Sequence, residues 1–262
     1  MKVVIYIGHH KVGSTSLQVF LSQNSHQLLQ NGILYPYVEM RGAAYALLKA
    51  AGRGDQVEEL PANIREPHSA LAYKMMTEVS HRPVPKQFQM LPHQSQMFHA
   101  LRMQVITLKP KAVVLCSEAF SNFGAVDPVL VNQLRNVFAA DDSRVYCALR
   151  RPDDYIVSWQ GQRIKVGEKT ESLQYGGLSQ YFATIHFDYR LAVDAWIGRS
   201  PAETMVLRNY SDILASGGSE VDFMQHSGVE FPNSLIPNAI PANKSLPTAL
   251  HEVVRLANAA LT

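Results

Sequence analysis

The chain has 262 residues, of which 47% are hydrophobic and 18% are charged, and its formal net charge is +2. This length fits one large α/β domain, although it also allows two small domains. The composition excludes a disordered chain and a strongly basic nucleic-acid binder, so that any site for an anion has to be local.

The N-terminal residues predict a strand, a loop and a helix. Val3 to Ile7 is a mostly β-branched run that ends at Gly8, and apolar residues then recur at helical spacing from Leu17 to Leu29. The first run carries one positive charge and is too short for a signal peptide, and no window reaches the roughly 18 apolar residues of a membrane span. We therefore expect a cytoplasmic protein without a membrane span.

Strands and helices are predicted to alternate further along the chain. Continuous apolar runs predict strands at 112–116 and 144–149 and a weaker strand at 204–207, with helical patterns at about 128–139, 153–166 and 187–197. This alternation favours an α/β fold with a doubly wound, mostly parallel sheet flanked by helices. The two cysteines, Cys116 and Cys147, lie inside predicted strands and are expected to be packed, reduced thiols.

The stretch from about 40 to 107 interrupts the alternation. It is rich in His, Gln, Met, Pro and Ala and contains no clear strand, which indicates a mostly helical insertion in a single domain spanning 1–262. Because doubly wound folds bind ligands outside the carboxyl ends of their strands, this insertion could overhang that crevice. Gly and Pro recur in 216–241, which predicts a loop-rich segment, and helical spacing resumes at 246–261.

The loop between the first strand and the first helix is predicted to bind an anion. Gly8-His9-His10-Lys11-Val12-Gly13-Ser14-Thr15 has the spacing of the phosphate-binding pattern G-x-x-x-x-G-K-[ST], but Ser14 stands in place of the lysine and Lys11 comes three residues earlier. A nucleoside triphosphate site needs that lysine, so the loop suits one or two anionic groups better. The donors would be backbone N–H groups and the hydroxyls of Ser14, Thr15 and Ser16. An ordinary capped helix is the alternative interpretation.

A second anion site is predicted directly after the strand at 144–149. Arg150-Arg151-Pro152 follows the strand, and Ser158 lies eight residues after Arg150 in the next predicted helix. A guanidinium and a hydroxyl that face the same crevice suit a phosphate monoester. Alone, the motif also fits a solvated helix boundary, but its place in the same sheet as the first loop favours a ligand.

Together these two motifs resemble a known pair. Lys11-Val12-Gly13-Ser14-Thr15-Ser16-Leu17, with Arg150-Arg151-Pro152 and Ser158, is similar to the two segments with which the sulfotransferase superfamily binds 3′-phosphoadenosine-5′-phosphosulfate (PAPS). The resemblance implies a P-loop NTPase-like sulfotransferase fold with PAPS as donor, 3′-phosphoadenosine-5′-phosphate (PAP) as product and no metal. It implies that Lys11 contacts the 5′-phosphosulfate and its bridging oxygen, and that Arg150 and Ser158 hold the 3′-phosphate. Asn243-Lys244-Ser245-Leu246 resembles the basic segment that covers the nucleotide in bacterial and carbohydrate-type members.

Glu118 is the candidate general base, because it follows the strand at 112–116 and can face the same crevice. It resembles the glutamate that acts as base in carbohydrate and protein-tyrosine sulfotransferases. Partial burial would raise its pKa and its proton affinity near neutral pH. The alternatives are that Glu118 only caps the next turn, or that His9 or His10 beside the loop is the base. The ten histidines show no metal-ligand spacing, so we predict no metal site.

The sequence thus predicts transfer of a sulfuryl group from PAPS to the hydroxyl of a small molecule or glycan, with no nucleic-acid partner. Such a transfer needs an in-line acceptor oxygen and neutralisation of the leaving phosphate. The insertion at about 40–107 is the candidate acceptor-binding region. The alternatives are a P-loop nucleotide kinase or NTPase, which Ser14 at the lysine position opposes, and a catalytically silent nucleotide-binding module. The sequence leaves the acceptor and the oligomeric state open.

Overall fold

The computed structural model describes residues 1–53, 60–88, 90–138, 140, 142–197, 203–238 and 246–260. Its centre is a five-stranded, all-parallel sheet in the order β2-β3-β1-β4-β5. The strands are β1 (Lys2–Tyr6), β2 (Ile33–Leu34), β3 (Ala112–Cys116), β4 (Asp142–Leu149) and β5 (Glu203–Asn209). The four predicted strands are confirmed, whereas β2 is too short to produce a recognisable pattern.

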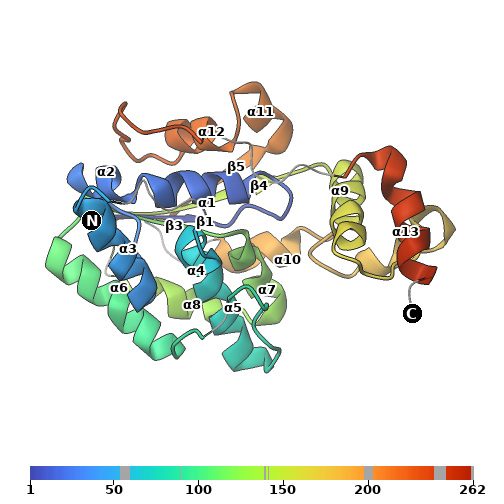
Figure 1. The fold of residues 1–262 in the computed structure, drawn as a ribbon, viewed down its shortest axis with the longest axis horizontal. Helices are drawn as coiled ribbons and strands as arrows, with labels where there is room; N and C mark the ends of the chain where they lie inside the picture. Colours follow the sequence, from blue (N-terminus) through green and yellow to red (C-terminus); the bar gives the residue numbers. More distant parts are fainter. Residues whose placement is uncertain are drawn as a thin grey trace.

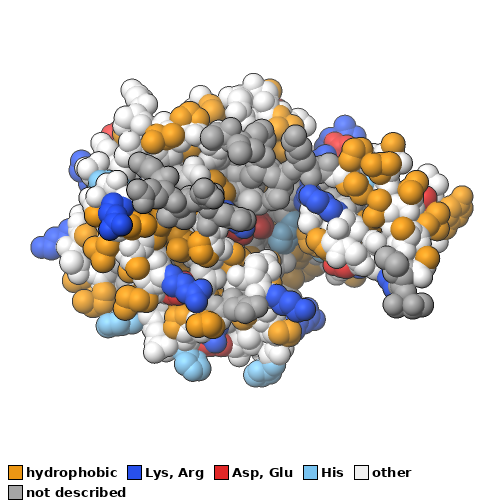
Figure 2. Space-filling view, in the orientation of Figure 1, with side chains coloured by type: hydrophobic (Ala, Val, Ile, Leu, Met, Phe, Trp, Pro, Cys, Tyr) orange, Lys and Arg blue, Asp and Glu red, His pale blue; other side chains and the backbone are white. Residues whose placement is uncertain are grey.

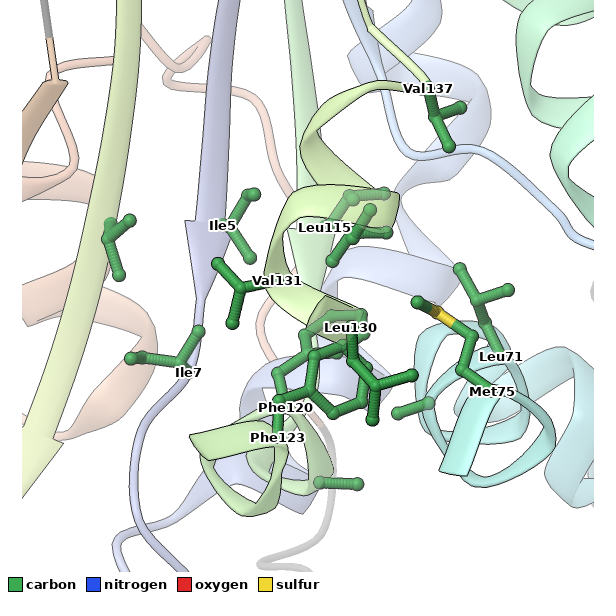
Figure 3. Close-up of a cluster of buried hydrophobic side chains, with 14 of the residues drawn as sticks. Ile5, Ile7, Leu71, Met75, Leu115, Phe120, Phe123, Leu130, Val131 and Val137 are labelled. Atoms are coloured by element: carbon green, nitrogen blue, oxygen red, sulfur yellow. The ribbon is translucent and has the colours of Figure 1, made fainter. Parts of the chain in front are cut away.

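The sheet separates two hydrophobic cores, because successive side chains of a strand point to opposite faces. In β1, Val3 and Ile5 belong to one core, and Val4 and Tyr6 belong to the other. Strands buried on both faces give continuous apolar runs, which explains why the sequence identified them. Figure 3 shows part of the first core. In it, Ile5 of β1 lies in one cluster with side chains from the segment after β3, among them Phe120, Phe123, Leu130 and Val131.

Helices cover both faces of the sheet (Figure 1), which is compatible with a doubly wound α/β fold. Side chains of α1 (Ser14–Gln23), α2 (Ser25–Gln30), α11 (Tyr210–Ala215) and α12 (Ser219–His226) enter the core that contains Tyr6. The opposite core receives α5 (Pro67–Ser80), α6 (Gln94–Leu108), α7 (Phe123–Val126), α8 (Val129–Arg135) and α10 (Arg190–Val193). Cys116 and Cys147 are buried and free, as expected.

The predicted insertion at about 40–107 is mostly helical where the structure describes it. It contains α3 (Met40–Ala50), α4 (Ala62–Arg65), α5 and almost all of α6. None of the described helices is both long enough and apolar enough to cross a membrane.

Three details of the sequence prediction are wrong. The single helix expected from Leu17 to Leu29 is interrupted at Asn24, between α1 and α2. The pattern at 187–197 gives only α10 and a 3₁₀ turn, Asp194–Trp196. The segment expected to be loop-rich begins with α12, which Gly217 and Gly218 precede at positive φ, so that the glycines mark the entrance to a helix and not a long loop.

Two helices form a lobe beside the main body (Figure 1). α9 (Pro152–Lys165) follows β4, and α13 (His251–Ala260) packs against it. The side chain of Asn258 donates a hydrogen bond of 2.8 Å to the carbonyl of Ile164, which joins the two helices near their ends. The lobe therefore brings the C-terminal helix next to the segment that carries Arg150 and Ser158.

Candidate functional site

A cavity of about 520 Å³ lies where the segments after β1, β3 and β4 meet. Because parallel strands place their carboxyl ends at one edge of the sheet, motifs far apart in sequence converge there. In Figure 2 a hollow separates the lobe from the body, and acidic, basic and histidine side chains gather around it. The predicted site residues that line the cavity are Lys11, Gly13, Ser14, Thr15, Ser16, Glu118, Arg150 and Ser158.

The loop after β1 has the backbone curvature expected of an anion-binding loop. Lys11 and Gly13 have φ values of 62° and 79°, in the left-handed region that Lys rarely occupies. Gly13 is also required for space, because a Cβ there would lie 2.2 Å from the Ser219 hydroxyl. The first intrahelical bond of α1 runs from the Leu17 amide to the Gly13 carbonyl, so the amides of the preceding turn point out of the helix. Val12 is fully buried in the core and can contribute only backbone groups to the loop.

Lys11 carries the positive charge of this loop into the cavity. Its Nζ donates a hydrogen bond of 3.3 Å to Oε1 of Gln162 on α9. Burial lowers the pKa of Lys11, and the nearby positive charges of Lys165 and Arg150 lower it further. The other two cations therefore repel the Lys11 ammonium, and an anion bound beside Lys11 would relieve that repulsion.

Arg150 and Ser158 line the cavity on the side of the lobe. The Arg150 guanidinium lies 5.4 Å from the centre of the Tyr210 ring, and the Arg150 carbonyl accepts a hydrogen bond of 2.7 Å from the Tyr189 hydroxyl. Arg150 is thus held by contacts to its backbone and to its guanidinium. The prediction that Arg150 and Ser158 face one crevice is confirmed by their positions.

Glu118 is largely buried just after β3, with part of its side chain on the cavity wall. Burial raises the pKa of Glu118, and hydrogen bonds from its own backbone and from the Ser14 and Gln18 side chains offset part of that effect. The Gln18 bond measures 2.9 Å. A raised pKa brings the carboxylate closer to the operating pH, which makes it a stronger proton acceptor and suits it to act as a general base.

Two of the three predicted hydroxyl donors point to carboxylates. Ser14 bonds to Glu118, and the Ser16 hydroxyl donates a hydrogen bond of 2.5 Å to Glu220 on α12. Asn238 joins the second contact by donating to the same Glu220 oxygen at 2.5 Å. We therefore expect an anion here to be bound mainly by the first-turn amides, the Thr15 hydroxyl and Lys11. Three further predicted residues, Asn243, Lys244 and Ser245, lie outside the described residues.

The two histidines proposed as alternative bases differ in position. His9 is fully buried, away from the cavity lining, and its Nε2 donates a hydrogen bond of 2.8 Å to the Ile185 carbonyl. Burial lowers the pKa of His9 to about 3. His10 lines the cavity beside Trp159, with the ring centres 5.2 Å apart, and burial lowers its pKa to about 4. Of these two histidines, only His10 is therefore placed to accept a proton from a ligand in the cavity.

The insertion contributes Glu66, Tyr73 and Gln87 to the cavity lining. The sequence marked Tyr73 only as one of several insertion residues compatible with a hydroxylated acceptor, and it did not indicate Glu66 or Gln87. Burial and the negative charge of Glu118 raise the pKa of Glu66, whose Oε1 is paired with Arg65 at 2.9 Å. No local pattern marks Glu66, which lies between α4 and α5 and reaches the cavity through the packing of these helices, or Gln87, which lies in the segment between α5 and α6. Trp159 and Gln162 of α9 were also missed, although Gln162, four residues after Ser158 in the predicted helix, could have been placed on the same face.

Among the described residues, no group of three or more His, Cys, Asp or Glu side chains is arranged to hold a metal ion. Comparison with known proteins gives no family: no family model, no curated protein and no solved structure matches this chain.

Proposed function

We propose that this protein is a sulfotransferase with a P-loop-like sulfotransferase fold, which transfers the sulfuryl group of PAPS to a hydroxyl on a small molecule or glycan. One observation carries the proposal: the loop of Lys11, the pair Arg150 and Ser158, and Glu118 all line a single cavity. Each of these three groups would meet a different requirement of sulfuryl transfer.

The donor would be held at both of its phosphorylated ends. The first-turn amides of α1 and Lys11 suit the 5′-phosphosulfate, because a helix N-terminus and an ammonium both stabilise negative charge. Arg150 and Ser158 suit the 3′-phosphate, since a guanidinium and a hydroxyl provide several donors to one phosphate. Ser14 occupies the position of the lysine that a nucleoside triphosphate site requires, and the loop carries its lysine at Lys11 instead. This difference supports PAPS over ATP.

The protein's own residues would then assist an in-line transfer. The bond between sulfur and the bridging phosphate oxygen breaks, a bond between sulfur and the acceptor oxygen forms, and the acceptor proton passes to Glu118. Lys11 neutralises the charge that develops on the leaving phosphate, which is the larger electrostatic requirement. Glu118, with its raised pKa, provides the proton affinity.

The insertion would bind the acceptor. Glu66 and Gln87 provide hydrogen-bonding groups, and Tyr73 adds a ring, to the lining of the cavity that Glu118 also lines. Such a wall favours a polar, hydroxylated acceptor over an apolar one.

Calorimetry with PAP and with ATP, each with and without magnesium, tests the donor site. We expect PAP to bind far more tightly than ATP without magnesium, whereas equal affinities would contradict the proposal. A broad panel of hydroxylated acceptors with labelled PAPS tests transfer. Tight PAP binding without transfer to any acceptor would instead indicate a silent nucleotide-binding module, and magnesium-dependent ATP hydrolysis would indicate an NTPase.

A further inference from the structure

The charged side chains that line the cavity of about 520 Å³ are separated by sign. The basic residues come from the anion loop, the end of β4 and α9, namely Lys11, Arg150 and Arg163. Two acidic residues, Glu66 and Glu118, come from the insertion and from the turn after β3. The third acidic lining residue, Glu168, lies in the lobe and is paired with Arg163 at 2.7 Å. An anionic donor uses the basic part, which leaves Glu66 and Glu118 to face the acceptor.

The segments that carry Glu66 and Glu118 are held together by a buried hydrogen bond. It joins the hydroxyls of Ser69 and Ser117, which are 2.8 Å apart. Ser69 is three residues after Glu66, and Ser117 directly precedes Glu118. In addition, α5 packs against the 3₁₀ turn that begins at Glu118. The packing therefore brings two carboxyl groups to one part of the cavity, and the negative charge of Glu118 acts on Glu66.

The negative charge of Glu66 is only partly balanced by its basic neighbour. Arg65 donates to one carboxylate oxygen at 2.9 Å, but Arg65 lies outside the cavity lining. Only 13% of the Glu66 side chain is exposed. Burial and the charge of Glu118 raise the pKa of Glu66, so a cation bound beside it in the cavity would stabilise its ionised form. A carboxylate accepts about four hydrogen bonds, which leaves capacity for such a ligand.

Tyr73 places an aromatic ring beside these carboxyl groups. It is four residues after Ser69, on the same face of α5, and it lines the cavity. Its ring packs against Phe88, with the ring centres 5.6 Å apart. The negative charges of Glu118 and Glu66 both act on the Tyr73 hydroxyl and, with burial, raise its pKa. An aromatic ring next to carboxylates suits an organic cation, because the face of the ring attracts positive charge.

We propose that the acceptor is a hydroxylated amine, whose ammonium group is bound by Glu66 and Tyr73 while its hydroxyl lies at Glu118. The inference rests on the proposed function, because it assigns this part of the cavity to the acceptor. A protonated amine has no lone pair with which to attack sulfur, so the hydroxyl remains the nucleophile and its proton passes to Glu118 as before. Glu66 is then the residue that selects a cationic acceptor over a neutral or anionic one.

Two matched pairs of acceptors test the inference with labelled PAPS: glucosamine against N-acetylglucosamine, and tyramine against N-acetyltyramine. The members of each pair share their hydroxyl groups and differ by one positive charge. In a pair that is sulfated, the amine should have a KM about ten-fold lower, as expected for one charged contact. Glu66→Gln should reduce this ratio to less than about three-fold and leave PAP affinity unchanged, and Glu66→Asp should keep most of the preference. Glu168→Gln, which removes a negative charge from the lobe side of the same cavity, is the matched control and should keep the ratio.

The outcomes separate this inference from the proposed function. If neither these pairs nor the broad panel yields a sulfated product, both are wrong. If transfer occurs but the N-acetyl member is used as well as the amine, or only neutral or anionic acceptors are sulfated, the inference is overturned while the proposed function stands. An unchanged ratio in Glu66→Gln, or an equal loss in Glu168→Gln, would also overturn it. Circular dichroism melting checks that the variants are folded, and if Glu66→Gln does not fold, the wild-type ratio and Glu66→Asp decide.

Discussion

The side-chain amide of Gln18 donates a hydrogen bond of 2.9 Å to Oε2 of Glu118, a residue 100 positions further along the chain. Gln18 is itself fixed, because its Oε1 accepts a hydrogen bond of 2.9 Å from the Ser69 hydroxyl. Gln18 belongs to α1, the helix that begins at the anion loop, and Ser69 belongs to α5 of the insertion. The carboxylate proposed as base is thus oriented by a hydrogen-bond chain that joins α1, which follows the predicted anion loop, to α5 of the insertion.

Glu118→Gln should lower kcat by about 10²–10⁴ while PAP affinity stays nearly intact, because glutamine keeps the shape but cannot accept the proton. Because burial raises the pKa of Glu118, wild-type kcat/KM should fall as pH drops through a value above the ordinary 4.3 of glutamate, and this acidic limb should vanish in the variant. Glu78→Gln, on the outer surface of α5, is the control. More than about a tenth of wild-type turnover in Glu118→Gln would remove the base assignment, and His10 would be tested next.

Lys11→Ala should weaken PAP binding and also lower kcat, because in the proposed function the ammonium would contact the phosphosulfate before bond cleavage and the charged phosphate during it. Steady-state kinetics and PAP calorimetry measure the two effects separately. Lys169→Ala should change neither. A loss of PAP affinity with unchanged kcat would show that Lys11 binds the donor without acting on the transferred group.

Arg150→Ala and Ser158→Ala should mainly raise the KM for PAPS, since a 3′-phosphate far from the sulfur is held equally in the ground and transition states. Loss of a charged hydrogen bond of about 1.5–3 kcal/mol corresponds to roughly a 10- to 150-fold increase for the arginine. Arg151→Ala is the matched control, because Arg151 is exposed and paired with Asp153 at 2.6 Å. An unchanged KM with a collapse of kcat in Arg150→Ala would contradict the assignment.

The buried histidines should make stability fall in acid. The pKa of His9 is lowered to about 3 and that of His10 to about 4 by burial, whereas both have values near 6.5 in the unfolded chain. The unfolded state therefore binds more protons, so the free energy of unfolding should decrease as pH falls from about 6.5 towards 4. Urea denaturation across this range should show a shallower slope for His9→Gln, which keeps an amide donor near Ile185.

The exposed His99 provides the control for this measurement, because His99→Gln should leave the pH slope unchanged. A slope in His9→Gln that equals the wild-type slope would show that His9 does not contribute to the pH dependence.

The sequence by itself determined the parallel α/β core, because strands buried on both faces produce continuous apolar runs that local pattern detects. It also indicated Lys11, Glu118 and Arg150 as candidate site residues, since each lies in a segment that follows a strand, and a parallel sheet places such segments at one edge. Ser158 lies within α9, the helix after β4, and was indicated by its separation of eight residues from Arg150. Their meeting in one cavity follows from the sheet order.

Only the tertiary structure decided which further side chains complete the site. Glu66 reaches the cavity through the packing of the insertion, and His251 lies against α9 because Gly161 leaves room for its ring. The same packing directs the Ser16 hydroxyl to Glu220 and buries His9 away from the cavity. These contacts join residues that are mostly more than 50 positions apart, and local periodicity carries no information about which distant surfaces will pack together.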